Sequence, residues 1–173
     1  QQGRRIAILG PDGPVRLGEE GTIAVHRSDP GLMLGYLDAP EETAARMQGD
    51  WFLTGDQGAM DAQGQITYLG RRDDMMNAGG FRVSPLEVEA VLAHVPGISA
   101  VAVVEVNIKA DTTVIAAFYT GAALDDSDLE AYVSDKLARY KQPRLYVHLP
   151  ELPMGANGKI LRRALRASFE ARK

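Results

Sequence analysis

The sequence predicts an α+β fold in two parts: a small antiparallel β-rich subdomain, part of a distorted barrel, followed by a domain with a three-stranded sheet flanked by helices. Short strand-like runs separated by turns fill residues 1–72. After a polar, glycine-bearing stretch, residues 73–173 instead combine apolar strands with helices that carry capping residues. The chain has 173 residues, 45% of them hydrophobic, which is enough for two small domains.

The first part contains a series of short predicted strands. RRIAIL at residues 4–9 runs into the turn GPDGP, and GTIAVHR at 21–27 alternates apolar and polar side chains, as a half-buried strand does. DAPEETAARM at 38–47 begins with turn residues and continues as a short helix. WFLTGD at 51–56 and QITYLG at 65–70 are two more strands, joined by QGAMDAQG. Such a series indicates a small antiparallel sheet or part of a barrel.

The second part follows RRDDMMNAGGF, which its charges and glycines predict to be a loop or linker. SPLEVEAVLAHV is a helix with Ser84 as N-cap, Pro85 in the first turn and Glu87 completing a capping box. AVAVVEV and TVIAAFYT are apolar strands joined by NIKAD, RLYVHL is a third strand, and a basic helix comes last. Another helix starts near Ser127, capped with Glu130, and its apolar stripe is Leu129, Tyr132, Val133, Leu137 and Tyr140.

The composition excludes several classes of protein. A net charge of -4 and a pI near 5.4 argue against a nucleic-acid partner. The absence of cysteine excludes disulfides and thiolate metal sites, and the three scattered histidines lack ligand spacing, so no metal site is expected. No run approaches the roughly 18 apolar residues of a membrane span, and no secretory signal is present, so a cytoplasmic location fits best. The sequence opens without Met, inside a strand-like run, and we expect a fragment of a longer protein.

A lysine in the stretch PMGANGKILRR is the first candidate for chemistry. Lys159 follows a glycine-bearing loop, where a mobile ammonium can be directed at a phosphate or a carboxylate. The stretch is not a Walker phosphate loop, because only two residues separate Gly155 from Gly158 and Ile160 stands where that motif needs Ser or Thr. Taken alone, Lys159 could equally be an ordinary surface lysine.

Two further stretches have similarly open interpretations. Asp56, which ends WFLTGD, could belong to a simple turn or could accept hydrogen bonds from a ribose diol. Arg71 in GRRDDMMNAGGFRVSPLEVE could be part of a solvated charge cluster or could bind a phosphate bidentately. The pair Gly79–Gly80 could simply break the chain, or it could let the backbone pass close to a ligand.

Together, in this order, the motifs resemble those of the adenylate-forming superfamily of acyl-CoA synthetases, luciferases and peptide-synthetase adenylation domains. The resemblance covers essentially the whole chain. It rests on GTIAVHRSDPGLMLGYLDAPEETAARM, on WFLTGDQGAMDAQGQITYLGRRDD, on NAGGFRVSPLEVE, and on YKQPR with LPMGANGKILRRAL. It implies an AMP-forming acid–CoA ligase: a carboxylic acid and ATP give an acyl-adenylate and pyrophosphate, and coenzyme A then takes the acyl group.

The resemblance also assigns nucleotide-binding residues and a hinge. Asp56 would hold the ribose hydroxyls, Tyr68 would lie against the nucleoside, and Arg71 would contact ribose or phosphate. Asp73 would be the hinge about which a mobile domain at residues 73–173 turns between the two steps, while residues 1–72 would end a larger N-terminal domain.

The remaining assignments concern the acceptor and the chemistry. Gly79 and Gly80 would line the pantetheine tunnel, and Arg82 would contact coenzyme A. Lys159 would be the catalytic lysine of adenylation, since an ammonium between a carboxylate and a triphosphate offsets their repulsion in the transition state. Magnesium would be bound by a part that this chain lacks.

The chain departs from the family pattern in two ways. Asn77 stands where many members have lysine, which puts a basic group at that position in doubt. The Ser/Thr/Gly-rich phosphate loop and the acid pocket are missing, so the chain resembles the last third of a member and is expected to be inactive alone. Two alternatives stay open: an adenylation domain that serves a carrier protein, and a non-catalytic module or half of a split enzyme. A homo-oligomer is also possible.

Overall fold

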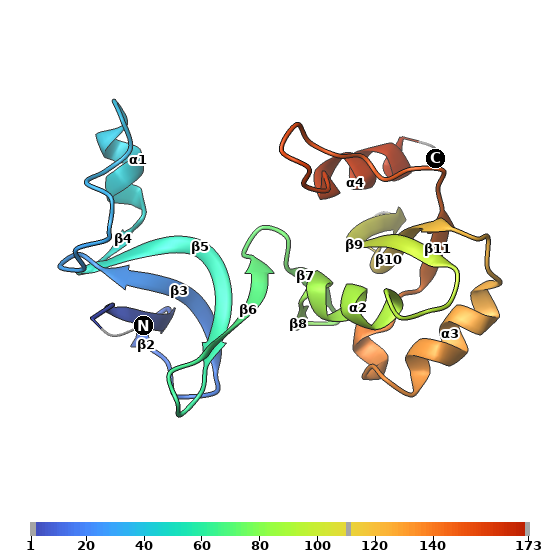
Figure 1. Cartoon of the computed structure of the whole chain (residues 1–173), viewed down its shortest axis with the longest axis horizontal. Coiled ribbons are helices and arrows are strands. Elements are labelled where there is room, and N and C mark those ends of the chain that lie inside the picture. Colours follow the sequence, from blue (N-terminus) through green and yellow to red (C-terminus); the bar gives the residue numbers. More distant parts are fainter. Residues whose placement is uncertain (1–2, 110–111, 172–173) are drawn as a thin grey trace. The chain divides into compact units, whose positions relative to one another are not determined.

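The computed structural model describes residues 3–109 and 112–171. The chain divides into two compact units, one ending at Asp73 and one beginning at Asp74, both visible in Figure 1. Strands dominate both units and helices are few, so the fold is α+β as the sequence predicts.

The first unit is a curled antiparallel sheet of six strands in the order β2–β1–β3–β5–β4, with β6 also paired to β5. The long strand β5 pairs with β3, with β4 at its beginning and with β6 at its end, and Figure 1 shows it bending along its length. Helix α1 (Pro40–Ala45) precedes β4. The strands are β1 (Ile6–Gly10), β2 (Gly13–Pro14), β3 (Glu20–His26), β4 (Met47–Gln48), β5 (Trp51–Met60) and β6 (Ile66–Arg71).

An enclosed carboxylate anchors the loop that follows β3. The side chain of Asp29 is fully buried and accepts hydrogen bonds from Arg4 Nη1 at 2.9 Å, from the backbone N–H of Arg5 at 2.7 Å and from that of Gly31 at 2.8 Å. The two backbone N–H groups, followed by the arginine, stabilise the ionised form and lower the pKa of Asp29 below its usual value. The carboxylate therefore ties the first residues of the unit to this loop.

Replacing Asp29 with Asn should destabilise the first unit at neutral pH. A carboxyl whose pKa is lowered by folding contributes stability above its unfolded pKa of about 3.9 and loses that contribution as the pH falls through the folded value. The difference in free energy of unfolding between the wild type and Asp29→Asn should therefore become smaller in acid. Trp51, the only tryptophan of the sequence, lies in this unit and reports urea unfolding by fluorescence. Asp50→Asn is the control, because Asp50 is 61% exposed in its ion pair with Arg27; an equal shift for both variants would contradict the prediction.

The second unit is built on a three-stranded sheet in the order β11–β10–β9. Strands β9 (Ile98–Lys109) and β10 (Thr112–Gly121) are antiparallel, and β11 (Leu145–His148) lies parallel to β10. A hairpin of β7 (Met76–Ala78) and β8 (Phe81–Val83) precedes the sheet. In the described part of the unit, four helical segments accompany the strands: α2 (Pro85–Leu92), α3 (Asp126–Ser134), the 3-10 turn η1 (Arg139–Lys141) and α4 (Arg162–Glu170).

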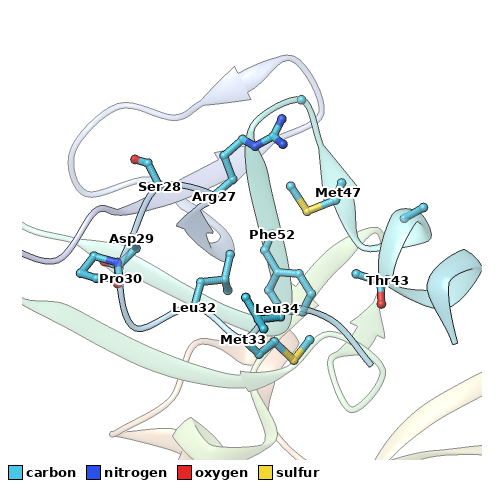
Figure 2. A pocket seen from close by; sticks show the side chains of 12 residues that line it. Arg27, Ser28, Asp29, Pro30, Leu32, Met33, Leu34, Thr43, Met47 and Phe52 are labelled. Carbon is cyan, nitrogen blue, oxygen red and sulfur yellow. The ribbon is translucent and has the colours of Figure 1, made fainter. Parts of the chain in front are cut away.

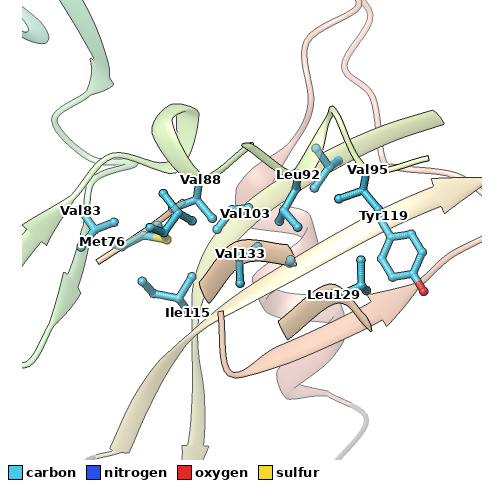
Figure 3. Close-up of a cluster of buried hydrophobic side chains, with 13 residues drawn as sticks. Met76, Val83, Val88, Leu92, Val95, Val103, Ile115, Tyr119, Leu129 and Val133 are labelled. Carbon is cyan, nitrogen blue, oxygen red and sulfur yellow. The ribbon is translucent and has the colours of Figure 1, made fainter. Parts of the chain in front are cut away.

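Helices cover both faces of this sheet, as predicted. One face of β9 and β10 packs against α2 and α3, in the cluster that Figure 3 shows around Val88, Leu92, Leu129 and Val133. The opposite face packs against Leu165 of α4. Alternate residues of β9 and β10 enter the two cores, so both strands must be apolar at nearly every position. The buried strand residues are Val101, Val103, Ile115, Ala117 and Tyr119 on the first face and Ala102, Val104, Val106, Ala116 and Phe118 on the second.

Candidate functional site

Lys159 lies at the end of a tight loop in the second unit. Met154 and Ile160 form an isolated antiparallel bridge that closes the loop. Inside it, the backbone N–H of Gly155 donates to the carbonyl of Lys159 at 2.7 Å, and that of Gly158 donates to the carbonyl of Gly155 at 2.9 Å. Gly158 has a φ of +72°, in the left-handed region where a side chain is disfavoured. The glycines of the motif thus fold the backbone into a hairpin-like turn that presents Lys159.

The ammonium of Lys159 is available to a ligand. The residue is exposed, and among the described residues it makes no side-chain hydrogen bond or ion pair. Asn157 holds the backbone instead, because its Oδ1 accepts from the N–H of Lys159 at 3.3 Å. A fixed backbone with a long side chain exposed to solvent allows this cation to reach an anion.

Asp56 and Arg71 form a pair in the first unit. They are directly opposite each other on β5 and β6, and Arg71 Nη1 lies 3.1 Å from Asp56 Oδ1. Arg71 Nη1 also donates to the carbonyl of Thr54 at 3.3 Å, and Arg71 Nε lies 3.7 Å from Asp73 Oδ1. Both side chains of the pair keep a third or more of their surface exposed, so a carboxylate and a guanidinium are offered side by side.

The Thr-Gly-Asp sequence is part of β5 rather than a simple turn. Gly55 has a φ of +83°, and a Cβ there would lie only 3.0 Å from the guanidinium nitrogens of Arg46 and Arg71. Thr54 Oγ1 donates to the carbonyl of Ile23 at 2.8 Å and accepts from the N–H of Asp56 at 3.1 Å. The threonine therefore fixes the carboxylate-bearing residue to β3, and the glycine makes room for the arginines.

Tyr68 and the glycine pair occupy two further exposed positions. Tyr68 lies on β6 opposite Gly58 and is 49% exposed. Gly79 and Gly80, with φ values of +60° and +89°, form the two-residue turn between β7 and β8. Positive φ at both positions is the geometry of a type I′ hairpin turn. No atom of residues 3–109 and 112–171 lies within 4 Å of a Cβ at either glycine, so among these residues backbone geometry, not crowding, requires glycine.

Asn77 has a structural role that sequence reasoning did not supply. Its Oδ1 accepts from the N–H of Gly80 at 3.1 Å, and its own N–H donates to Glu105 Oε2 at 2.8 Å. The asparagine thereby stabilises the glycine turn. Arg82 is exposed on β8, and a hollow of about 260 Å³ beside Gly79 is lined in part by Arg139 and Arg144.

Sequence reasoning missed three other features. Phe81 and Tyr140 stack at 4.7 Å although both are exposed. Arg162 pairs with Glu89 across 73 residues, a contact with no local sequence signal. The first unit also has a hollow of about 710 Å³, which is lined by the loop after β3, by α1 and by Phe52 and by none of the predicted site residues. Figure 2 shows the side chains that line it.

The described residues also bear on metals and membranes. Across 3–109 and 112–171, no cluster of three or more histidine or acidic side chains could hold a metal ion. No helix of the part that the structure describes has the length and apolar character to cross a membrane.

The chain is similar to CoA ligases along most of its length. It is 37% identical over 160 residues to the Rhodococcus jostii 3-[(3aS,4S,7aS)-7a-methyl-1,5-dioxo-octahydro-1H-inden-4-yl]propanoyl:CoA ligase, covering 90% of this chain and 31% of that protein. It is 38% identical to the 2-succinylbenzoate–CoA ligase of Geobacillus kaustophilus, covering 93% of this chain and 33% of that one. The chain thus spans about a third of the length of these relatives.

Solved structures show the same relationship. The o-succinylbenzoate CoA synthetase of Bacillus subtilis superposes with a TM-score of 0.88 at 30% identity, over 95% of this chain and 34% of that one. That protein has been solved with its acyl-adenylate intermediate, with AMP, and with ATP and a magnesium ion. Residues 87–159 of the present chain match the AMP-binding enzyme C-terminal domain. The chain therefore belongs to the adenylate-forming superfamily, in which its relatives are acyl-CoA ligases.

Proposed function

We propose that this chain is the portion of an AMP-forming acid–CoA ligase that carries the catalytic lysine of adenylation. In the complete enzyme a carboxylic acid and ATP give an acyl-adenylate and pyrophosphate, and the thiol of coenzyme A then displaces AMP. The observation that carries the proposal is the exposed ammonium of Lys159 on a backbone turn fixed by Gly155, Gly158 and Asn157. Adenylation brings two anions together, and a cation reaching between them stabilises the transition state.

The nucleotide is assigned to the first unit. Asp56 accepts hydrogen bonds from the ribose hydroxyls, Arg71 contacts ribose or phosphate, and Tyr68 lies against the nucleoside. The ion pair at 3.1 Å supports this assignment, because Arg71 holds the carboxylate in place while the exposed part of it can take a diol. Asp73, whose carboxylate lies near Arg71, is the proposed hinge.

Coenzyme A is assigned to the glycine turn of the second unit. Gly79 and Gly80 line the pantetheine path, and Arg82 contacts the coenzyme. The support is the bare turn, which has no side chain to obstruct a ligand, and the neighbouring hollow with its arginines. In an enzyme as long as the relatives, the remaining part would carry the magnesium site, the ATP phosphate loop and the acid pocket. The chain alone is therefore inactive. A cytoplasmic location completes the proposal.

A second acceptor is possible for the same chemistry. The amide bond synthetase of Marinactinospora thermotolerans superposes on the chain with a TM-score of 0.86 at 29% identity. Because that protein is an amide bond synthetase, an amine is an alternative acceptor for the acyl group, and a carrier-protein thiol is a further one. The acceptor must be decided by the product.

The product assay tests the proposal directly. The full-length protein is incubated with ATP, a panel of carboxylic acids, and either coenzyme A, a carrier protein or an amine. We expect acid-dependent release of AMP together with an equal amount of acyl-CoA, and no release by the 173-residue chain alone. An amide or a carrier-bound product would show that coenzyme A is not the acceptor. Release of ADP in place of AMP would refute the adenylate-forming reaction.

Replacing Asp56 with Asn should weaken ATP recognition through the ribose. Loss of a charged hydrogen-bond acceptor costs about 1.5–3 kcal/mol, or roughly 10- to 100-fold in kcat/KM for ATP. The wild-type preference for ATP over its 2′,3′-dideoxy analogue should shrink in the variant. Asp61→Asn, in the exposed turn after β5, is the control. An unchanged preference in Asp56→Asn would contradict the ribose assignment.

A further inference from the structure

An arginine joins the start of α4 to α2. Arg162, the first residue of α4, places Nη2 at 2.7 Å from both carboxylate oxygens of Glu89. Glu89 Oε1 also accepts from the backbone N–H of Val103 on β9 at 2.7 Å. The two side chains are only 18% and 12% exposed. One carboxylate therefore connects the beginning of α4 with a second helix and with the central sheet.

The same guanidinium also approaches the first residue of the second unit. Arg162 Nη1 lies 4.0 Å from Asp74 Oδ2, and Asp74 directly follows Asp73 in the chain. Arg162 thus lies near Asp74, which adjoins the proposed hinge. Arg162 also follows Lys159 by three residues in the chain.

This arrangement is costly for a contact that only stabilises the fold. Burial raises the pKa of Glu89 against the lowering effect of its hydrogen bonds with Val103 and Arg162, and the charge of Asp74 adds to the rise. Arg162 Nε is buried with no hydrogen-bond partner among the described residues. A buried ion pair is often no more stabilising than apolar side chains of the same size, so its use at this place favours a role in fixing geometry.

The backbone between Arg162 and Lys159 can transmit that geometry. The N–H of Leu161 donates to the carbonyl of Pro153 at 2.8 Å, and Ile160 is bridged to Met154. The segment that leads from Lys159 to Arg162 is therefore held on its partner segment and has little freedom to absorb a displacement. A shift of the start of α4 would move Lys159, and a misplacement of about 1 Å can cost on the order of 100-fold in rate.

We propose that Arg162, held by Glu89, is a positioning residue that sets the place of Lys159 for adenylation. This inference rests on the proposed role of Lys159. Arg162 is assigned no contact with substrate or with reacting atoms, and acts through the loop that ends at Lys159. Its contribution should accordingly be confined to the step that uses the lysine.

A second arginine on α4 provides a matched control. Arg166 lies one turn further along the helix and donates from Nε to the carbonyl of Glu105 on β9 at 2.8 Å. It holds α4 on the sheet at a point more distant along the chain from Lys159. Removing either guanidinium costs one anchor of α4, but only Arg162 is joined to the Lys159 loop through the bridged backbone.

The test compares Arg162→Met, Arg162→Lys, Arg166→Met, Glu89→Gln and Lys159→Ala in the full-length protein. Acid-dependent pyrophosphate release measures adenylation, and acyl-CoA formation from supplied acyl-adenylate measures the second step. For Arg162→Met we expect adenylation kcat to fall about 10- to 100-fold, with the KM for ATP and the second step unchanged. Arg162→Lys should recover part of the loss, and Arg166→Met should leave the ratio of the two steps at its wild-type value.

Glu89→Gln keeps the inference testable if Arg162→Met fails to fold, because the amide preserves shape and removes only the charge. It should lower adenylation selectively, by less than Arg162→Met. An equal loss in both steps for Arg162→Met and Glu89→Gln, or the same selective loss in Arg166→Met, would overturn the positioning role. If Lys159→Ala leaves adenylation intact, the proposed function itself is refuted. If Lys159→Ala abolishes adenylation but Arg162→Met does not lower it selectively, only the positioning role of Arg162 is refuted.

Discussion

Lys159→Ala should lower the rate of acyl-adenylate formation by about 10²–10³-fold, the usual effect of losing one group that stabilises transition-state charge. The ammonium is exposed and unpaired among the described residues, so its removal breaks no contact there and leaves the loop hydrogen bonds, which are made by backbone and by Asn157. The effect should appear in kcat more than in the KM for either substrate, because the charge repulsion is greatest in the transition state.

Two companions make this result specific. Lys159→Arg keeps the charge on a longer, planar group and should recover only part of the rate. Arg163→Ala removes an exposed cation four residues further along the chain and should have no effect. A comparable loss in Arg163→Ala would indicate general loss of positive charge and would argue against a particular role for Lys159.

Phe118→Ala should give the largest loss of stability, about 3–5 kcal/mol in the free energy of unfolding of the second unit. Phe118 is 2% exposed on β10, on the face that α4 covers, and its ring meets that of Phe169 edge-to-face at 6.0 Å. Truncation removes the ring from among Leu152, Leu165 and the neighbouring strands and leaves a cavity there. Urea unfolding followed by circular dichroism, with hydrogen exchange of the β9 and β10 amides, measures the change.

Phe81→Ala makes the same truncation where the ring is 58% exposed. Its loss should stay below about 1.5 kcal/mol, the upper end for an aromatic pair such as its stack on Tyr140. Equal losses at the two positions would contradict the packing of α4 against β10, since burial is what separates them.

The sequence predicted the strands well because their apolar pattern is imposed by what covers them. In the second unit, both faces of β9 and β10 are buried, and the apolar runs follow directly. In the first unit, the linker predicted at 57–64 was partly wrong, because β5 continues to Met60. Gly58, which suggested a turn, is needed for close approach: a Cβ there would lie 2.9 Å from the carbonyl of Thr67 on the neighbouring strand.

Elements stabilised by distant or purely backbone interactions were harder to predict. The stretch 71–81, expected as a loop, contains β7 and the start of β8, because a type I′ turn needs only glycines and a polar neighbour. The Ser127 capping box was wrong: α3 begins at Asp126 with Asp125 as N-cap, and the helix ends at Ser134. Leu137 is nevertheless buried, since the turn after the helix returns it to the core.

The candidate site divides in the same way. Lys159, Asp56 and the glycine turn belong to contiguous motifs, so the sequence alone identifies them as candidates. Their roles in binding and catalysis stay predictions. The link from Arg162 to Glu89 connects residues 73 positions apart and depends on how α2 and α4 pack on the sheet. No local pattern specifies such a pair, and only the folded chain identifies it.

The role of Lys159 is tested most directly by the rate at which Lys159→Ala, in the full-length protein, converts a supplied acyl-adenylate and coenzyme A into acyl-CoA and AMP. A lysine that serves adenylation alone predicts the wild-type rate for this step, although the same preparation forms almost no acyl-adenylate from acid and ATP. A loss of equal size in both steps would contradict the assignment, because Lys159 would then support the fold or the binding of AMP and would not be the catalytic group of the first reaction.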